Sequence, residues 1–371
     1  MSDAELQALG TQVLGAAFVL GLLFGAIAQR THFCTMGAVA DVVTMGDWSR
    51  LRMWALAIGV AMLGFNGMVA LGWLRAADSL YAAPQWLWLS QIVGGLMFGF
   101  GMVLASGCGS KTLVRIGGGN LKSLVVFGVL ALAAFATLKG ITAVLRVGTV
   151  DRVALQLPAG QDLPSLLAWA TGGSAQRLAG WLGLLCGGGL IAWVLARREG
   201  RSATVLVGGI GIGAVVVGAW WVSGRFGHLA EHPQTLEPAF LATNSQRMEA
   251  FSFVAPLAYT VDWLLFFSDR NKLLTQGIVI VVGVVLGSAA VALQARSFRW
   301  EGFRGVEDTT LHLGGAMLMG VGGVTALGCT IGQGLSGVST LSIGSALALA
   351  AIVGGAVLAL RWQTWRIERT A

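Results

Sequence analysis

Three cysteines of this 371-residue chain stand where a glycine-dotted apolar stretch meets polar residues. Cys34 follows QRTHF, Cys108 is followed by GSKT, and Cys329 is followed by TIGQGLSG. A thiol is a soft, polarizable group and a weak hydrogen-bond donor, so it suits a ligand that carries a sulfur atom of its own. A buried thiol should also stay neutral, and it can then donate to an anion that a thiolate would repel.

The cysteine spacing excludes some other kinds of site. The chain has four cysteines, far apart and with no CxxC pair, which argues against a zinc site or a thioredoxin-type redox centre. The fourth, Cys186, lacks the polar surroundings of the other three, and we expect it to be an inert structural residue of the core.

The residues around Cys108 indicate that the ligand is an anion. Ser110 and Thr112 accompany the free backbone N–H groups expected where a new helix begins, and such a helix start favours an anion. Lys111 and Arg115 lie one helical turn apart and would draw an anion inward. We expect the neighbouring glycines to let the backbone turn. The predicted substrate path comprises Cys34, Gly107, Cys108, Gly109, Ser110, Lys111, Thr112, Arg115, Gly328, Cys329 and Gln333.

The glycine-rich stretches that end in the three cysteines, here called the cysteine elements, are related by an internal repeat. Gly94–Cys108 aligns without gaps with Gly315–Cys329, and the two share glycines, a valine, an alanine and the cysteine in register. A weaker copy runs from Gly21 to Cys34. The glycines also fit the small-xxx-small pattern of closely packed membrane helices.

Composition predicts that membrane-spanning helices position these residues. The chain is 56% hydrophobic and 11% charged, against roughly a quarter charged residues in a soluble domain. Many charge-free windows reach the ~20 residues that cross a bilayer. We predict an all-α, polytopic integral membrane protein with short re-entrant elements. Its nine expected spans are about 12–28, 51–74, 86–106, 121–138, 179–196, 203–222, 276–295, 311–328 and 341–360.

Loop charge predicts the orientation of these spans. With the N-terminus outside, five inside segments each hold three Lys or Arg, counting Arg52 with the first, whereas the short outside loops hold one or none. The Cys108 element then ends inside and the Cys329 element ends outside. This polarity predicts one transporter domain, residues 1–371, built as an inverted repeat with halves of about 12–138 and 179–360 related by a pseudo-two-fold axis.

Other classes of protein find little support. The net charge of +7 is scattered rather than gathered into a stripe, which disfavours nucleic acid as a partner. No Walker A loop or nucleophile–base pair is present, and His228 with His232 makes a poor metal site. We expect a transporter rather than an enzyme, with no cofactor and no metal. The segment 251–268 is apolar but contains Asp262, so it is expected to be re-entrant, interfacial or a tenth span.

The chain resembles the YeeE/YedE family of bacterial inner-membrane proteins, whose characterised members take up thiosulfate. The resemblance rests on QRTHFCTMGA, GFGMVLASGCGSKTLVRIGGGN and GGAMLMGVGGVTALGCTIGQGLSG. It implies an hourglass-like protein of the inner membrane. The orientation expected from loop charge then makes the N-terminus periplasmic and the C-terminus cytoplasmic. In that picture thiosulfate passes between Cys108, Cys329 and Cys34 through S–H···S contacts without a lasting covalent bond.

Two alternatives stay open from the sequence. One is a membrane sulfur-transfer enzyme that forms a persulfide on a cysteine, and the other is a permease for selenium compounds or sulfide. Besides the lipid bilayer, a cytoplasmic sulfurtransferase-like protein is a possible partner, since the tail is expected on that side.

Overall fold

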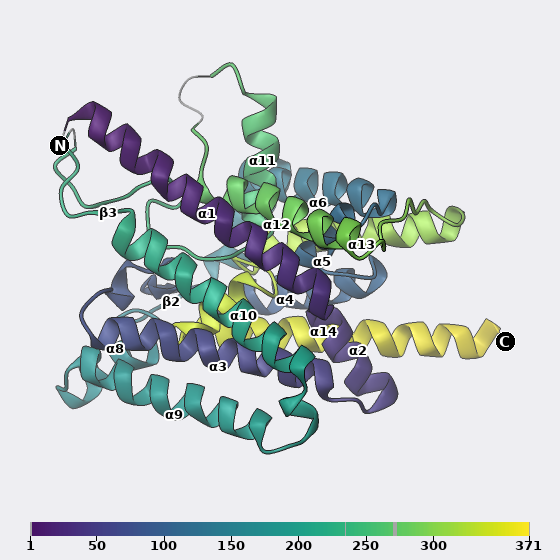
Figure 1. The fold of residues 1–371 in the computed structure, drawn as a ribbon, viewed down its shortest axis with the longest axis horizontal. Helices are drawn as coiled ribbons and strands as arrows, with labels where there is room; N and C mark the ends of the chain where they lie inside the picture. The colour runs from purple at the N-terminus through teal and green to yellow at the C-terminus, as the bar shows by residue number, and fades with distance from the viewer. Residues whose placement is uncertain (1, 234, 270–272, 371) are drawn as a thin grey trace.

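The computed structural model describes residues 2–233, 235–269 and 273–370. Within this part of the chain the fold is a bundle of long helices, with the two termini at opposite ends (Figure 1). The principal helices are α1 (Asp3–Thr31), α2 (Thr35–Met45), α3 (Ser49–Ala70), α4 (Trp88–Leu104), α5 (Gly109–Gly117), α6 (Leu121–Lys139), α7 (Ile141–Gly148), α8 (Leu163–Thr171), α9 (Ala175–Leu195), α10 (Ala203–Trp221), α11 (Ala255–Leu265), α12 (Gln276–Gln294), α13 (Val306–Thr325) and α14 (Ile343–Thr370).

The remaining elements are short. Two antiparallel strand pairs join β1 (Gln85–Trp86) to β2 (Leu155–Gln156) and β3 (His228–Leu229) to β4 (Ala239–Phe240). Two segments are π-helical, η5 (Val222–Phe226) and η6 (Gly332–Gly337). Four short 3₁₀ turns complete the set: η1 (Ala76–Asp78), η2 (Leu80–Ala82), η3 (Val150–Arg152) and η4 (Glu199–Arg201).

The predicted all-α, polytopic membrane fold is confirmed. Among the described residues, eight helical stretches are long and apolar enough to cross a membrane: Ala4–Met45, Ser49–Ala70, Trp88–Gly117, Leu121–Lys139, Ala175–Leu195, Ala203–Phe226, Gln276–Gln294 and Ile343–Arg369. Eight of the nine expected spans fall largely within them. The ninth, 311–328, falls mostly within α13, which lies outside this set and carries Glu307 and Asp308 in its first turn.

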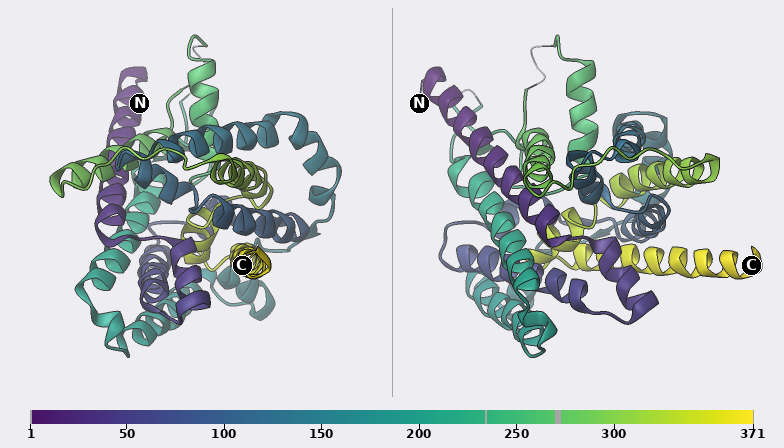
Figure 2. Two further views of the ribbon diagram at one scale, coloured as in Figure 1. Left: turned by 90° about the vertical axis from the view of Figure 1, so that its right-hand side faces the viewer. Right: turned by 45° about the vertical axis from the view of Figure 1, so that its right-hand side comes forward.

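The ambiguous segment 251–268 forms α11, which is not a tenth span. Its 11 residues reach only about 16 Å at 1.5 Å per residue, against ~30 Å of hydrocarbon. The helix stands steeply across the long helices instead of running with them (Figure 2). Its Asp262 pairs with Lys139 at the end of α6, where Nζ lies 3.0 Å from Oδ2.

Glycines let the central helices approach each other closely. A Cβ on Gly94 of α4 would lie 2.6 Å from the Gly322 carbonyl oxygen of α13, and a Cβ on Gly101 would lie 2.7 Å from that of Gly315. Because Gly94 aligns with Gly315 and Gly101 with Gly322, these two contacts are reciprocal. The small residues shared by the repeats therefore form the antiparallel contact between α4 and α13.

Candidate functional site

The same helix ending precedes each of the three cysteines. The residue two positions before the cysteine has a left-handed backbone: His32 (φ 53°), Ser106 (φ 56°) and Leu327 (φ 61°). The next N–H then reaches back to a carbonyl five residues earlier, in Phe33 to Ala28 (3.2 Å), Gly107 to Met102 (2.8 Å) and Gly328 to Gly323 (2.8 Å). This bonding satisfies the last carbonyls of a helix and ends it sharply.

This geometry corrects one expectation. Neither Gly107 nor Gly109 has the left-handed backbone, so the turn before Cys108 depends on Ser106. Gly109 is needed for a different reason. A Cβ there would lie 2.9 Å from the carbonyl oxygen of Phe253, so a side chain would push against a neighbouring segment.

Each thiol is buried and held by at least one hydrogen bond. Cys34 begins α2, and its Sγ accepts from the N–H of Gly37 at 3.4 Å. Sγ of Cys108, at the start of α5, lies 3.3 Å from Oγ of Ser110. Sγ of Cys329 accepts from the N–H groups of Gly332 and Phe253, both at 3.3 Å. Exposed fractions of 7%, 0% and 1% for Cys34, Cys108 and Cys329 place all three thiols inside the protein.

Cys186 differs from the other cysteines in a way that the sequence did not predict. It lies on α9 and is exposed. The expectation of a core residue is therefore wrong, because this face of α9 packs against nothing in the described chain.

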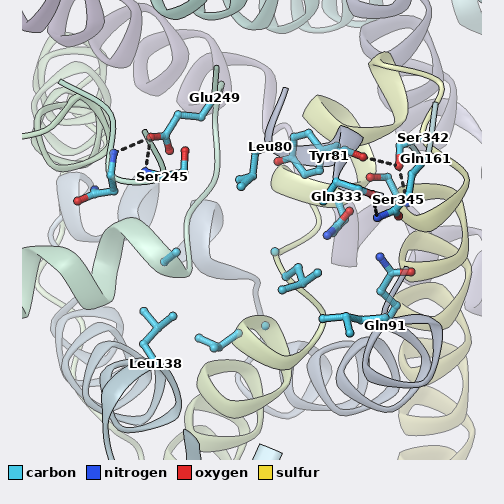
Figure 3. A pocket seen from close by; sticks show the side chains of 18 of the residues that line it. Leu80, Tyr81, Gln91, Leu138, Gln161, Ser245, Glu249, Gln333, Ser342 and Ser345 are labelled. Atoms are coloured by element: carbon cyan, nitrogen blue, oxygen red, sulfur yellow. Dashed lines mark hydrogen bonds between the residues drawn. The ribbon is translucent and has the colours of Figure 1, made fainter. Parts of the chain in front are cut away.

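Two cavities lie at opposite ends of α4, α6 and α13. The first, which we call the amide cavity, has a volume of about 360 Å³ and reaches the start of α4 and the ends of α6 and α13 (Figure 3). The second, the basic cavity, has a volume of about 550 Å³ and reaches the end of α4 and the starts of α6 and α13. The first is lined by residues that include Gln91, Gln161, Asn244, Gln333 and Gly328, and the second by residues that include His32, Lys111, Arg115, Lys122, Arg299 and Arg304.

The polar residues predicted around Cys108 lie in two different environments. Lys111 and Arg115 line the basic cavity, as expected of residues that attract an anion. Ser110 points its hydroxyl to the Cys108 thiol instead. The Thr112 hydroxyl donates to the Cys108 carbonyl at 3.0 Å, so its proton already has an acceptor within the helix.

The third element contributes a buried amide to the amide cavity. Nε2 of Gln333 donates to the Ala326 carbonyl at 2.8 Å, and its Oε1 is buried without a hydrogen-bond partner among the described residues. Arg146 of α7 lines the same cavity and pairs with Asp151, with 3.3 Å between Nε and Oδ2. Sequence reasoning missed Arg146, because nothing in the local sequence connects α7 with the cysteines.

The segment that carries Phe251 and Phe253 also contacts the candidate site, which sequence reasoning did not predict. Phe253 donates its N–H to Cys329 and contacts Gly109, so it joins two cysteine elements. Phe251 and Phe253 pack with Phe24 of α1, with ring centroids 5.0 to 6.0 Å apart, and all three rings are fully buried. An aromatic cluster thus closes the interior beside the thiols.

A pair of alanine substitutions tests this role of Phe253. Gly109→Ala should lower substrate uptake severalfold, because the new methyl group must displace the segment that holds the Cys329 thiol. Gly107→Ala is the matched control: the nearest atoms to its Cβ belong to the flexible side chains of Lys111, with Cγ at 3.1 Å, and Arg115, with Nη1 at 3.8 Å, and not to a backbone. Uptake by both variants is measured in membranes that contain equal amounts of protein. Equal rates for the two variants would contradict the packing argument.

Apolar helices that enclose buried polar groups between two cavities are typical of a membrane transporter. The chain belongs to the sulphur transport family, whose model matches residues 30–358. It is 25% identical over 326 residues to the thiosulfate transporter TsuA of Escherichia coli, covering 86% of each chain. It is 26% identical over 348 residues to the thiosulfate transporter TsuA of Spirochaeta thermophila, covering 91% of this chain and 94% of that one. A shorter match, 30% identical over 114 residues, is to the probable transporter YedE of Escherichia coli and covers 30% of this chain and 26% of that one.

Proposed function

We propose that this protein takes up thiosulfate across the bacterial inner membrane and passes it along three cysteine thiols. The observation that carries the proposal is the repeated placement of a buried thiol at a helix break, between a cavity rich in amides and a cavity rich in basic groups. Two relatives that cover most of the chain bear the name thiosulfate transporter, which supports this substrate over sulfide or selenium compounds.

The proposed path runs from the amide cavity to Cys329, then Cys108, then Cys34, and ends in the basic cavity. Gly328 and Gln333 border the amide cavity next to Cys329. Cys108 lies close enough to Cys34 and to Cys329 to interact electrostatically with both thiols, which supports its middle position. Cys34 has Lys111 and Arg115 as further neighbours, and both line the basic cavity.

The chemistry of transfer follows from the thiols themselves. Each S–H can donate a weak hydrogen bond to the terminal sulfur of thiosulfate, and the polarizable sulfur atoms favour contact with one another. Weak bonds suit transport, because a permeating ion must be held loosely enough to leave. No covalent bond forms or breaks along this path, so the protein acts as a transporter and not as an enzyme.

We further propose that the basic cavity opens to the cytoplasm. It is lined by residues from three of the five segments with excess Lys and Arg, namely 29–50, 107–122 and 296–310, and cytoplasmic loops carry that excess. The N-terminus is then periplasmic and the C-terminus cytoplasmic. A soluble sulfurtransferase-like protein would receive thiosulfate at this face.

The two halves, about 12–138 and 179–360, are proposed to be related by a pseudo-two-fold axis between α4 and α13. Reciprocal contacts of Gly94 with Gly322 and of Gly101 with Gly315 support this relation. The left-handed residues Ser106 and Leu327 occupy equivalent positions two residues before each cysteine. The symmetry would place Cys108 and Cys329 on opposite sides of the midplane.

Reconstituted protein tests the substrate directly. Liposomes that contain the purified protein should accumulate labelled thiosulfate, and unlabelled thiosulfate should compete more strongly than sulfate, selenite or sulfide. Empty liposomes serve as the control. Stronger competition by selenite or sulfide would contradict thiosulfate as the substrate, and the absence of any uptake would contradict transport by this chain alone.

A further inference from the structure

A carboxylate lies in the wall of the amide cavity, where the proposed function requires an anion to enter. Glu249 belongs to the segment between β4 and α11, and it lines the cavity together with Tyr81, Arg146 and Tyr259 (Figure 3). An ionised carboxylate in this position would repel a dianion across a cavity of only about 360 Å³. A carboxylate at this position is therefore expected to have a functional role as well as a structural one.

Glu249 has no cation to neutralise it among the described residues. It accepts hydrogen bonds from uncharged groups: the backbone N–H groups of Asn244 at 2.7 Å and Ser245 at 3.3 Å, which both reach Oε1, and the side chain of Ser245. Arg146, the basic group of the same cavity, is already paired with Asp151.

The other titratable and charged groups nearby do not supply the missing charge. Burial raises the pKa of Tyr81 and of Tyr259 above an already alkaline value, so both stay neutral. Asp262, close to Tyr259, is paired with Lys139. Arg247, two residues before Glu249, donates to the Ser79 carbonyl at 3.2 Å. Among these groups, Glu249 is thus the one whose charge is expected to change with pH.

Its surroundings favour the protonated form. Burial raises the pKa of Glu249 above its ordinary value, and the hydrogen bonds from Asn244 and Ser245 oppose this shift without reversing it. As pH falls through this raised pKa, the carboxylate gains a proton and loses its repulsion for an anion. The protonated carboxyl group can also donate a hydrogen bond.

We propose that Glu249 is a proton-binding site that must be filled before the anion occupies the amide cavity. The inference rests on the proposed function, since it concerns the same path. It gives Glu249 the task of linking anion entry to the proton concentration on the outer side. The proton binds first and the sulfur anion then occupies the cavity, and no bond other than the O–H of Glu249 is made or broken.

Thiosulfate binding to the purified, full-length protein tests this link. Calorimetry in buffers of different ionisation enthalpy measures how many protons are taken up with the ligand, at pH values between about 5 and about 9. We expect wild-type affinity to fall by up to about tenfold per pH unit above the pKa of Glu249, with proton uptake approaching one per thiosulfate. The Glu249→Gln variant keeps an acceptor for both N–H groups and should bind with pH-independent affinity and no proton uptake.

A control variant and the wild type each test the role of Glu249 further. Glu237→Gln removes the same charge from an exposed residue between β3 and β4 and should retain the wild-type pH profile. Wild-type binding without proton uptake and with constant affinity would overturn the role of Glu249 and leave the proposed function intact, even if Glu249→Gln failed to fold. A wild type that binds no thiosulfate at any pH would overturn the proposed function as well.

Discussion

Cys108→Ala should lower thiosulfate uptake by about 10- to 100-fold. The proposed path has Cys108 as its middle station, fully buried and an electrostatic neighbour of both Cys34 and Cys329. Losing a hydrogen bond to a charged partner costs about 1.5–3 kcal/mol, which corresponds to that range of rates. Initial uptake into reconstituted liposomes, normalised to the amount of folded protein, measures the effect.

The control for this prediction is Cys186→Ala. Cys186 is exposed on α9 and belongs to none of the three helix breaks, so its loss should leave uptake unchanged. Cys108→Ser should fall between the two, since a hydroxyl still donates but lacks the polarizable sulfur. Wild-type uptake by Cys108→Ala would rule out the relay through three thiols.

Gly99→Ala should destabilise the protein by about 1–3 kcal/mol, the usual cost of forcing an extra group into a packed interface. A Cβ on Gly99 of α4 would overlap the Ile352 carbonyl oxygen of α14 and lie 2.9 Å from the Ala356 nitrogen. Backbone atoms cannot move aside as a flexible side chain can, so the two helices must separate. The expected result is a lower melting temperature in detergent, together with reduced uptake.

Gly128→Ala provides a matched control within a helix. Nothing lies within 4 Å of a Cβ at Gly128 of α6, and alanine is favoured over glycine in helices by about 0.5–1 kcal/mol. This variant should melt at the same temperature as the wild type or slightly higher. A Gly99→Ala protein that melts together with Gly128→Ala would contradict the close packing of α4 on α14.

Sequence reasoning located the helices well because apolar length is a local property. The expected span 121–138 matches α6 almost residue for residue. It was less successful where the outcome depends on contacts with distant residues. Segment 251–268 forms a short crossing helix, α11, although its apolar character also permitted a span.

The site shows the same division between local and distant information. The three cysteines and the basic residues Lys111 and Arg115 stand out in the sequence, because a polar group at the end of an apolar helix is visible locally. Phe253 and Glu249 could not be found that way. Their roles arise from contacts with Cys329 and with the amide cavity, which join parts of the chain about 80 residues apart or more.

Following the two sulfur atoms of thiosulfate separately distinguishes non-covalent transfer between the thiols from a persulfide mechanism. Thiosulfate is labelled separately at its terminal and its central sulfur, and both forms are supplied to liposomes that contain only this protein. Transfer through non-covalent thiol contacts predicts that the two labels enter in equal amounts and that neither remains on the protein. A persulfide mechanism would break the sulfur–sulfur bond, so the terminal label would stay on a cysteine while the central label left as sulfite outside. That result would contradict the account.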